Sequence, residues 1–166
     1  MAASASANTQ SSNNPIVVLY KRYLTLPTPV EMYGDVAAWV GSVVMLAGRF
    51  FLAMPFWNAG QARLSNWGSQ SFLFQYEHPL PLLSPGQAAV LTTGAELVLP
   101  VLLILGLFGR LAGLGLGVMA ATIFFVIGGA YAIAAEQVPW MLVGLAIFIL
   151  GPGRLSADYW IGRFLR

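Results

Sequence analysis

Hydrophobic residues gather in four long stretches of the chain, at about residues 36–60, 86–108, 111–135 and 138–153. A helix needs about 20 mainly apolar residues to cross a bilayer, and the first three stretches reach that length. The fourth is short, so we expect it to gain length at one end or to lie where the bilayer is thin. The pattern predicts an all-α fold, an integral membrane four-helix bundle that occupies residues 36–153.

The segments before the first span differ from it in composition. Residues 1–14 are small and polar, without the basic and apolar parts of a signal peptide, and this predicts a disordered tail. Residues 15–35 mix aromatic and basic side chains around two prolines, the composition of a membrane-surface segment.

A long outside loop is expected after the first span, at residues 61–85, where aromatic residues and prolines predict a lid on the outer interface. The other two connections are expected to be tight turns, at Gly109-Arg110 and at about Glu136-Gln137. After the fourth span, residues 154–166 predict an inner-leaflet amphipathic helix, with Ser156 as its cap and Asp158 near its positive end.

Small residues recur every fourth position in the third stretch, at Gly109, Gly113, Gly117 and Ala121. Such a stripe allows a neighbouring helix backbone to approach closely. It is typical either of packing within the bundle or of a homodimer seam.

Composition narrows the class of protein. Of the 166 residues, 58% are hydrophobic and 8% are charged, against about a quarter charged in a soluble domain. This excludes a soluble globule, a disordered protein and a nucleic-acid-binding module. With no Cys and one His, the chain has no thiolate metal site, no multi-His metal centre and no covalently attached cofactor.

Basic residues in the flanks of the spans predict the orientation. The side that holds both termini carries Lys21, Arg22, Arg110, Arg154, Arg163 and Arg166. The opposite side carries only Arg63. Because Lys and Arg concentrate on the cytoplasmic side, the count predicts a multi-pass protein with both termini inside, N-in and C-in.

Two charged residues fall inside the apolar stretches, Arg49 in the first and Glu96 in the second. Each lies near the centre of its stretch, and the two helices are expected to run antiparallel, so we expect the charges to pair. The pair can be structural, fixing helix register. Alternatively, with the hydroxyls of Thr92 and Thr93, it lines a small cavity for a polar head such as a quinone carbonyl, or relays protons.

A second cluster is expected at the outer rim, formed by Arg63, Glu77 and His78. Adjacent residues before a proline cannot easily face one ion, so a rim salt bridge between Arg63 and Glu77 is favoured over a metal site. No nucleophile with a base, phosphate loop or dinucleotide fingerprint is present, so the sequence assigns no catalytic residues. The isolated chain is therefore not expected to be an enzyme.

Several motifs resemble the DoxX family of bacterial membrane proteins. They lie at residues 48–64 and 95–112, and in Gly151-Pro152-Gly153-Arg154-Leu155-Ser156-Ala157-Asp158, which resembles a closing GPGRxSxD signature. The matching positions are Arg49, Gly60, Glu96, Gly106, Arg110, Gly151, Pro152, Gly153, Arg154, Ser156 and Asp158. Arg63 departs from the pattern, because the family more often has Lys there.

The resemblance implies a four-span protein of the bacterial cytoplasmic (inner) membrane. It also implies relatives that are membrane subunits of a thiosulfate:quinone oxidoreductase or parts of redox-protective complexes. Our leading hypothesis is an accessory membrane subunit of a quinone-linked redox system, in contact with the lipid bilayer and with protein partners, and possible as a homodimer. The alternatives are a transport or assembly partner for a small solute or metal, and a structural scaffold without a ligand.

Overall fold

The computed structural model describes residues 15–26, 34–76, 83–127 and 131–165, and every regular element in those ranges is helical. Two of the elements are not α-helical, since η2 (Trp67–Ser69) is a turn of 3-10 helix and η3 (Ile123–Ile127) is a turn of π-helix. In chain order the elements are α2 (Pro15–Leu24), α3 (Asp35–Ser65), η2 (Trp67–Ser69), α4 (Gln70–Tyr76), α5 (Pro85–Leu105), α6 (Gly109–Thr122), η3 (Ile123–Ile127), α7 (Tyr131–Leu150) and α8 (Ala157–Phe164). The predicted all-α fold class is confirmed for these residues.

Two helices of the described part are long and apolar enough to cross a membrane, α3 with 31 residues and α5 with 21. At 1.5 Å per residue, α5 is about 31 Å long, close to the thickness of the hydrocarbon core of a bilayer. The apolar stretches Gly109–Phe125 and Glu136–Leu150 are shorter. Length and composition thus indicate a membrane protein, and the number of spans stays a prediction.

The outward faces of the two long helices carry large apolar side chains. Val43 and Phe51 of α3 are 58% and 51% exposed, and Val90 and Val98 of α5 are 57% and 55% exposed. An exterior of this kind would be costly in water and suits contact with lipid.

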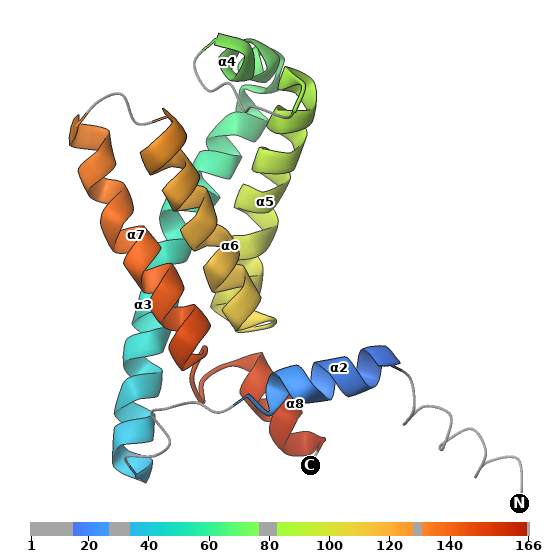
Figure 1. Ribbon diagram of the computed structural model, residues 1–166, viewed down its shortest axis with the longest axis vertical. Helices are drawn as coiled ribbons and strands as arrows, with labels where there is room; N and C mark the ends of the chain where they lie inside the picture. Colours follow the sequence, from blue (N-terminus) through green and yellow to red (C-terminus); the bar gives the residue numbers. More distant parts are fainter. Residues whose placement is uncertain (1–14, 27–33, 77–82, 128–130, 166) are drawn as a thin grey trace, which may run out of the picture.

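The helices α3, α5, α6 and α7 pack side by side, and short helices cover the two ends of this group (Figure 1). At one end α2 and α8 lie next to each other, below the last turn of α7. At the opposite end α4 packs on α5, with Phe74 buried against Ala88 and Ala89. We call these the α2/α8 end and the α4 end.

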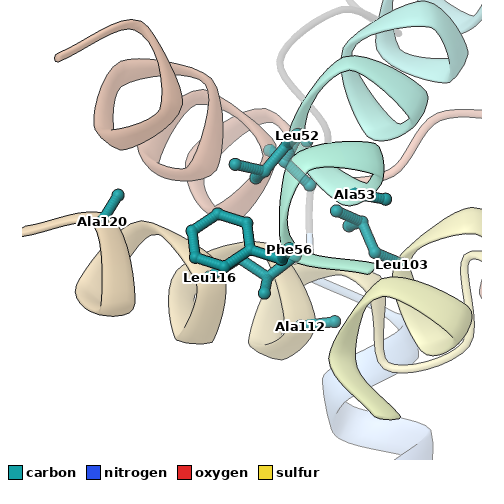
Figure 2. Close-up of a cluster of buried hydrophobic side chains, with 8 residues drawn as sticks. Leu52, Ala53, Phe56, Leu103, Ala112, Leu116 and Ala120 are labelled. Carbon is teal, nitrogen blue, oxygen red and sulfur yellow. The ribbon is translucent and has the colours of Figure 1, made fainter. Parts of the chain in front are cut away.

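An apolar core occupies the middle of the four packed helices. Figure 2 shows Phe56 of α3 directed toward α6, close to Leu116. Each core residue is at most 2% exposed, and the residues are Leu52, Ala53, Phe56, Leu103, Ala112, Leu116, Ala120 and Ile147. The core therefore separates the α2/α8 end from the α4 end.

The stripe of small residues in α6 packs on α7. A Cβ added to Gly113 would lie 2.9 Å from Cγ2 of Ile147, and one added to Gly144 would lie 2.7 Å from the Gly113 carbonyl oxygen and 2.9 Å from Cα of Gly117. The two backbones can approach this closely only because glycines face each other. The stripe thus makes a contact within the chain.

Helix bounds differ from the sequence analysis at two connections. α3 continues past Gly60 to Ser65, and the expected loop at residues 61–85 contains η2 and α4. The predicted turn at Glu136–Gln137 is wrong, because both residues lie inside α7. Glu and Gln favour a helix, so they do not interrupt one without a glycine or a proline turn.

Candidate functional site

Arg49 is fully buried in α3 and holds the α2/α8 end together. Its Nη1 donates to the carbonyl of Ile104, 3.3 Å away in the last turn of α5, and its Nη2 donates to the carbonyl of Leu155 at 2.6 Å. The last carbonyls of a helix have no partner within it and carry partial negative charge. Arg49 therefore joins α3, α5 and the segment before α8.

Glu96 pairs with a different arginine. The Nε of Arg63 lies 2.9 Å from Oε2 of Glu96, and the carboxylate is buried. The predicted Arg49–Glu96 pair is therefore wrong.

The register of α3 against α5 explains the error. Gly60 packs on Glu96, with an added Cβ 3.1 Å from the Glu96 Cβ, whereas Arg49 packs on Gly106 at the far end of α5. Arg49 and Gly60 are 11 residues apart, so the two charges differ in depth by about 16 Å. The sequence analysis aligned the centres of the two spans, whereas α5 packs along the later part of α3, so that the centre of α5 faces Gly60 and its end faces Arg49.

The Arg63–Glu96 pair lies under α4. Arg63 donates from Nη1 to Oε1 of Gln70 at 3.4 Å, and its guanidinium lies over the Phe74 ring, 5.0 Å from the centroid. Arg63 keeps 21% of its side chain exposed, whereas Gln70 and Phe74 are each 3% exposed. Short helix α4 thus covers the pair, and Arg63 reaches the surface.

Thr93 belongs to the same cluster by its place on α5, one turn before Glu96. Its hydroxyl is buried and has no hydrogen-bond partner in the described part of the chain. Thr92 is half-buried. We call Arg63, Glu96, Thr93, Gln70 and Phe74 the α4-end cluster. The sequence analysis grouped Arg49 with Glu96, Thr92 and Thr93. The α4-end cluster contains Glu96 and Thr93 of these, but not Arg49.

Glu77 and His78 lie outside the described residues, so the predicted rim pair of Arg63 with Glu77 stays a prediction. In the described part of the chain, no three His, Cys, Asp or Glu side chains come together in a way that could hold a metal ion.

Asp158 organises the α2/α8 end. Its carboxylate accepts from the backbone N–H groups of Phe108 and Gly109, at 3.0 and 2.8 Å, and from the hydroxyls of Tyr20 and Tyr23, at 3.4 and 3.3 Å. The side chain is buried. One carboxylate therefore fixes the α5–α6 turn, α2 and α8 together.

The tyrosine hydroxyls respond to this carboxylate. Burial, and then the charge of Asp158, raise the pKa of Tyr23 above its ordinary value of 10.0. The pKa of Tyr20 is raised for the same two reasons. Both tyrosines therefore stay protonated and donate to Asp158 throughout the physiological pH range.

The segment from Gly151 to Ser156 links α7 to α8 through polar contacts. The N–H of Arg154 donates to Oγ of Ser42 at 2.8 Å, and the Arg154 guanidinium pairs with Asp35 at 2.9 Å. The hydroxyl of Ser156 accepts from the N–H of Tyr159 and so caps α8, as the sequence predicted. Arg154 and Ser156, which match the GPGRxSxD motif, therefore hold this segment in place against α3 and α8.

Arg110 completes this end of the molecule. Its Nη1 donates to the carbonyls of Phe148 and Ile149, both at 2.9 Å, and these carbonyls belong to the last turn of α7. Arg110 and Arg49 thus each bind the last carbonyls of a neighbouring helix, α7 and α5 respectively. A positive charge is favourable at the C-terminal end of a helix.

A pocket of about 320 Å³ lies at the α2/α8 end. Its charged lining comprises Arg110, Arg154, Arg163 and Asp158, and its apolar lining includes Leu24, Met45 and Leu150. The sequence analysis did not predict this pocket. The pocket forms only where α2 and α8 lie together, and the sequence does not show that contact. The one sequence feature that pointed to it was the number of arginines assigned to the terminal side.

This chain is a helical membrane protein by class. Its helices are apolar, its exterior carries large apolar side chains, and charged residues are buried inside. Within that class, the DoxX family model matches residues 44–129, more than half of the chain, and the chain belongs to the DoxX family. The segment at residues 151–158 lies beyond the matched range. Comparisons with curated proteins and with solved structures give no significant match.

Proposed function

We propose that this protein is a four-span protein of the bacterial inner membrane, with both termini inside, and an accessory subunit of a quinone-linked redox system. Membership of the DoxX family and the two apolar helices long enough to span support the membrane part. The six basic residues assigned to the terminal side support the orientation.

The α4-end cluster carries the redox part of the proposal. It sets the Arg63–Glu96 pair, whose carboxylate is buried, one helical turn from a buried Thr93 hydroxyl that has no hydrogen-bond partner in the described part of the chain. A buried polar group without a partner costs about 1–3 kcal/mol, which a ligand can recover. The same helix, α5, carries the exposed apolar side chains of Val90 and Val98 on its outward face.

The residues of the cluster fit a quinone head. When bound, a quinone supplies a carbonyl pair that takes up electrons and protons on reduction. Arg63 and Thr93 would donate hydrogen bonds to a carbonyl oxygen, and Glu96 would hold a proton at its carboxylate. Phe74 and α4 would keep water away from the site.

The rest of the redox system would come from partners. The chain has no Cys and one His, so its own side chains offer little for binding a redox centre. The α2/α8 end offers an anchored surface for such a partner, because Asp158 of α8 accepts from two tyrosines of α2 and Arg49 donates to the segment before α8. In this scheme the isolated chain has no activity of its own.

Co-extracted quinone tests the proposal. We expect protein purified in mild detergent to retain quinone, measured by mass spectrometry against the quinone content of bulk membrane lipid. Thr93→Val keeps the side-chain shape and removes the hydroxyl, and we expect it to lower retention by roughly five- to tenfold. Thr122→Val is the matched control, because the Thr122 hydroxyl bonds within its own helix at 3.0 Å from the Val118 carbonyl.

Equal retention in both threonine variants, or no quinone in the unaltered protein beyond the lipid background, would refute a quinone site. Glu96→Gln distinguishes the scaffold alternative. If this variant unfolds more easily but retains quinone and supports the redox system unchanged, the buried pair is structural.

The transport alternative receives less support. A solute path would need polar groups from the α4 end to Arg110, and the apolar core, with residues at most 2% exposed, lies between them. We therefore retain the redox proposal as the leading one.

A further inference from the structure

The pocket at the α2/α8 end is lined by residues of α2 and α8 and by residues of the longer helices α3, α6 and α7. It is separated from the α4-end cluster by the apolar core, and so it belongs to a different site. The proposed quinone site does not use it.

The charge of the pocket lining favours an anion. Three arginines, Arg110, Arg154 and Arg163, line it against the single carboxylate of Asp158. That carboxylate already accepts from two backbone N–H groups and two tyrosine hydroxyls. Arg154 also pairs with Asp35, which lies outside the lining, so the three arginines keep an excess of positive charge over the two carboxylates, and Asp158 is engaged by the protein.

The apolar part of the lining favours an amphiphile over a simple ion. Leu24, Leu26, Met45 and Leu150 share the pocket with the arginines. Nearby on α8, Trp160 and Phe164 are 57% and 91% exposed, as is usual for side chains that enter a membrane interface. A ligand with an anionic group and an apolar chain could contact the arginines and the apolar side chains of the lining together.

We propose that this pocket binds the phosphate headgroup of an anionic phospholipid, with the arginines around the phosphate and the first part of the acyl region against the leucines. Planar guanidinium groups suit phosphate oxygens. α2 forms one wall through Tyr23 and Leu24, and Asp158 holds α2 in place, so the pocket depends on that contact.

Binding of short-chain phospholipids to the full protein in neutral detergent tests this proposal. The probes are dihexanoyl phosphatidylglycerol, dihexanoyl phosphatidylcholine and inorganic phosphate, followed by native mass spectrometry and calorimetry. We expect saturable binding of one phosphatidylglycerol, about tenfold or more tighter than phosphatidylcholine. Equal affinity for the two lipids would overturn an anion-selective site. Phosphate that binds as tightly as phosphatidylglycerol would overturn the lipid as the ligand.

Two double variants that remove the same charge distinguish binding in the pocket from general electrostatic attraction of the lipid to the protein. Arg154→Gln with Arg163→Gln removes two positive charges from the lining, whereas Lys21→Gln with Arg22→Gln removes two exposed charges of α2 outside it. We expect the first pair to weaken phosphatidylglycerol binding by about tenfold and the second to change it by less than about threefold. Equal losses in the two pairs would overturn the proposal.

A measurement on the unaltered chain covers the case in which a variant fails to fold. Bound phosphatidylglycerol should slow modification of Arg163 by an arginine-specific dicarbonyl reagent, read by peptide mass spectrometry, while Arg22 reacts at its original rate. Equal protection of both residues would contradict the pocket. The readout involves no quinone, so its failure leaves the redox proposal untouched.

Discussion

Single buried side chains decide how the ends of this protein are held. Arg49 bonds backbone carbonyls of two segments that are more than 50 residues from it in the chain. Asp158 likewise accepts from two backbone N–H groups of the α5–α6 turn and from two tyrosine hydroxyls of α2. Charged hydrogen bonds of this kind are individually stronger than neutral ones, so each residue should be expensive to replace.

We expect Arg49→Met to lower the free energy of unfolding by roughly 2–6 kcal/mol, because two buried carbonyls lose their donors at about 1–3 kcal/mol each. Thermal unfolding in detergent measures the change. Arg22→Met is the control, since Arg22 is exposed on α2, and it should be nearly neutral. A loss no larger than that of the control would mean that the carbonyls find other donors.

Tyr23 gives the stability of the protein a dependence on alkaline pH. The folded chain holds the Tyr23 proton more tightly than the unfolded chain, whose tyrosine pKa is near 10.0. Stability from this hydrogen bond is thus complete below about pH 10 and is lost as the pH rises further.

We expect Tyr23→Phe to be less stable at neutral pH by about 1 kcal/mol and to lose less stability between about pH 9 and about pH 11. Melting temperatures across that range provide the comparison. Tyr76→Phe, at an exposed tyrosine of α4, should follow the unaltered protein at every pH. Parallel curves for Tyr23→Phe and the unaltered chain would rule out this linkage.

At the scale of elements, glycines make the contact between α6 and α7. Gly144 of α7 faces Gly113 and Gly117 of α6, and the atoms that an added Cβ would meet are backbone atoms. Backbone cannot move aside as a side chain can, so the helices would have to separate.

We expect Gly144→Ala to destabilise the protein by about 1–3 kcal/mol through overpacking. Gly94→Ala in α5 should instead stabilise it by about 0.5–1 kcal/mol, because an added Cβ meets nothing within 4 Å and alanine favours a helix. Chemical or thermal unfolding of both variants tests the pair. Stabilisation by both substitutions would show that the α6–α7 contact is loose.

Local patterns in the sequence predicted most elements but not their registers. Apolar runs located the long helices, and Ser156 was recognised as a cap. The small-residue stripe left packing within the bundle and a homodimer seam open, and the structure shows it packed on α7. The partner of Glu96 was missed because it depends on how far α3 slides along α5. Arg63 lies about four helical turns after Arg49, and hydrophobic periodicity does not show which of the two arginines faces Glu96.

Tertiary contacts also explain the elements that the sequence did not predict. α4 has only seven residues and contains aromatic side chains with modest helix propensity. It is held by Phe74 against α5 and by Gln70 against Arg63, and neither contact is visible in its own sequence. Likewise, the pocket at the α2/α8 end needs α2 and α8, which are separated by almost the whole chain, to meet.

At the scale of the whole molecule, the two ends are chemically different. The α2/α8 end is arginine-rich and contains the pocket, whereas the α4 end contains the Arg63–Glu96 pair. If all four packed helices span the membrane, the two ends face different compartments.

The absence of cysteine from the sequence makes this topology directly testable with single cysteines. We expect a membrane-impermeant maleimide to label Gln75→Cys on α4 in intact cells, and Lys21→Cys on α2 only after the membrane is opened. Val98→Cys, on the apolar exterior of α5, should resist the reagent in both cases. Labelling of Lys21→Cys in intact cells would reverse the orientation or change the number of spans.

The apolar core between the two ends has an electrical consequence. In a bilayer it would act as an insulator, because moving a charge through the voltage drop costs about 2.3 kcal/mol per 100 mV in addition to desolvation. Arg49 and Glu96 lie on opposite sides of it, each fixed to its own end. If the four packed helices span the membrane, each end would equilibrate with the ions and pH of its own compartment, and abundant expression of the protein should not make the membrane leak.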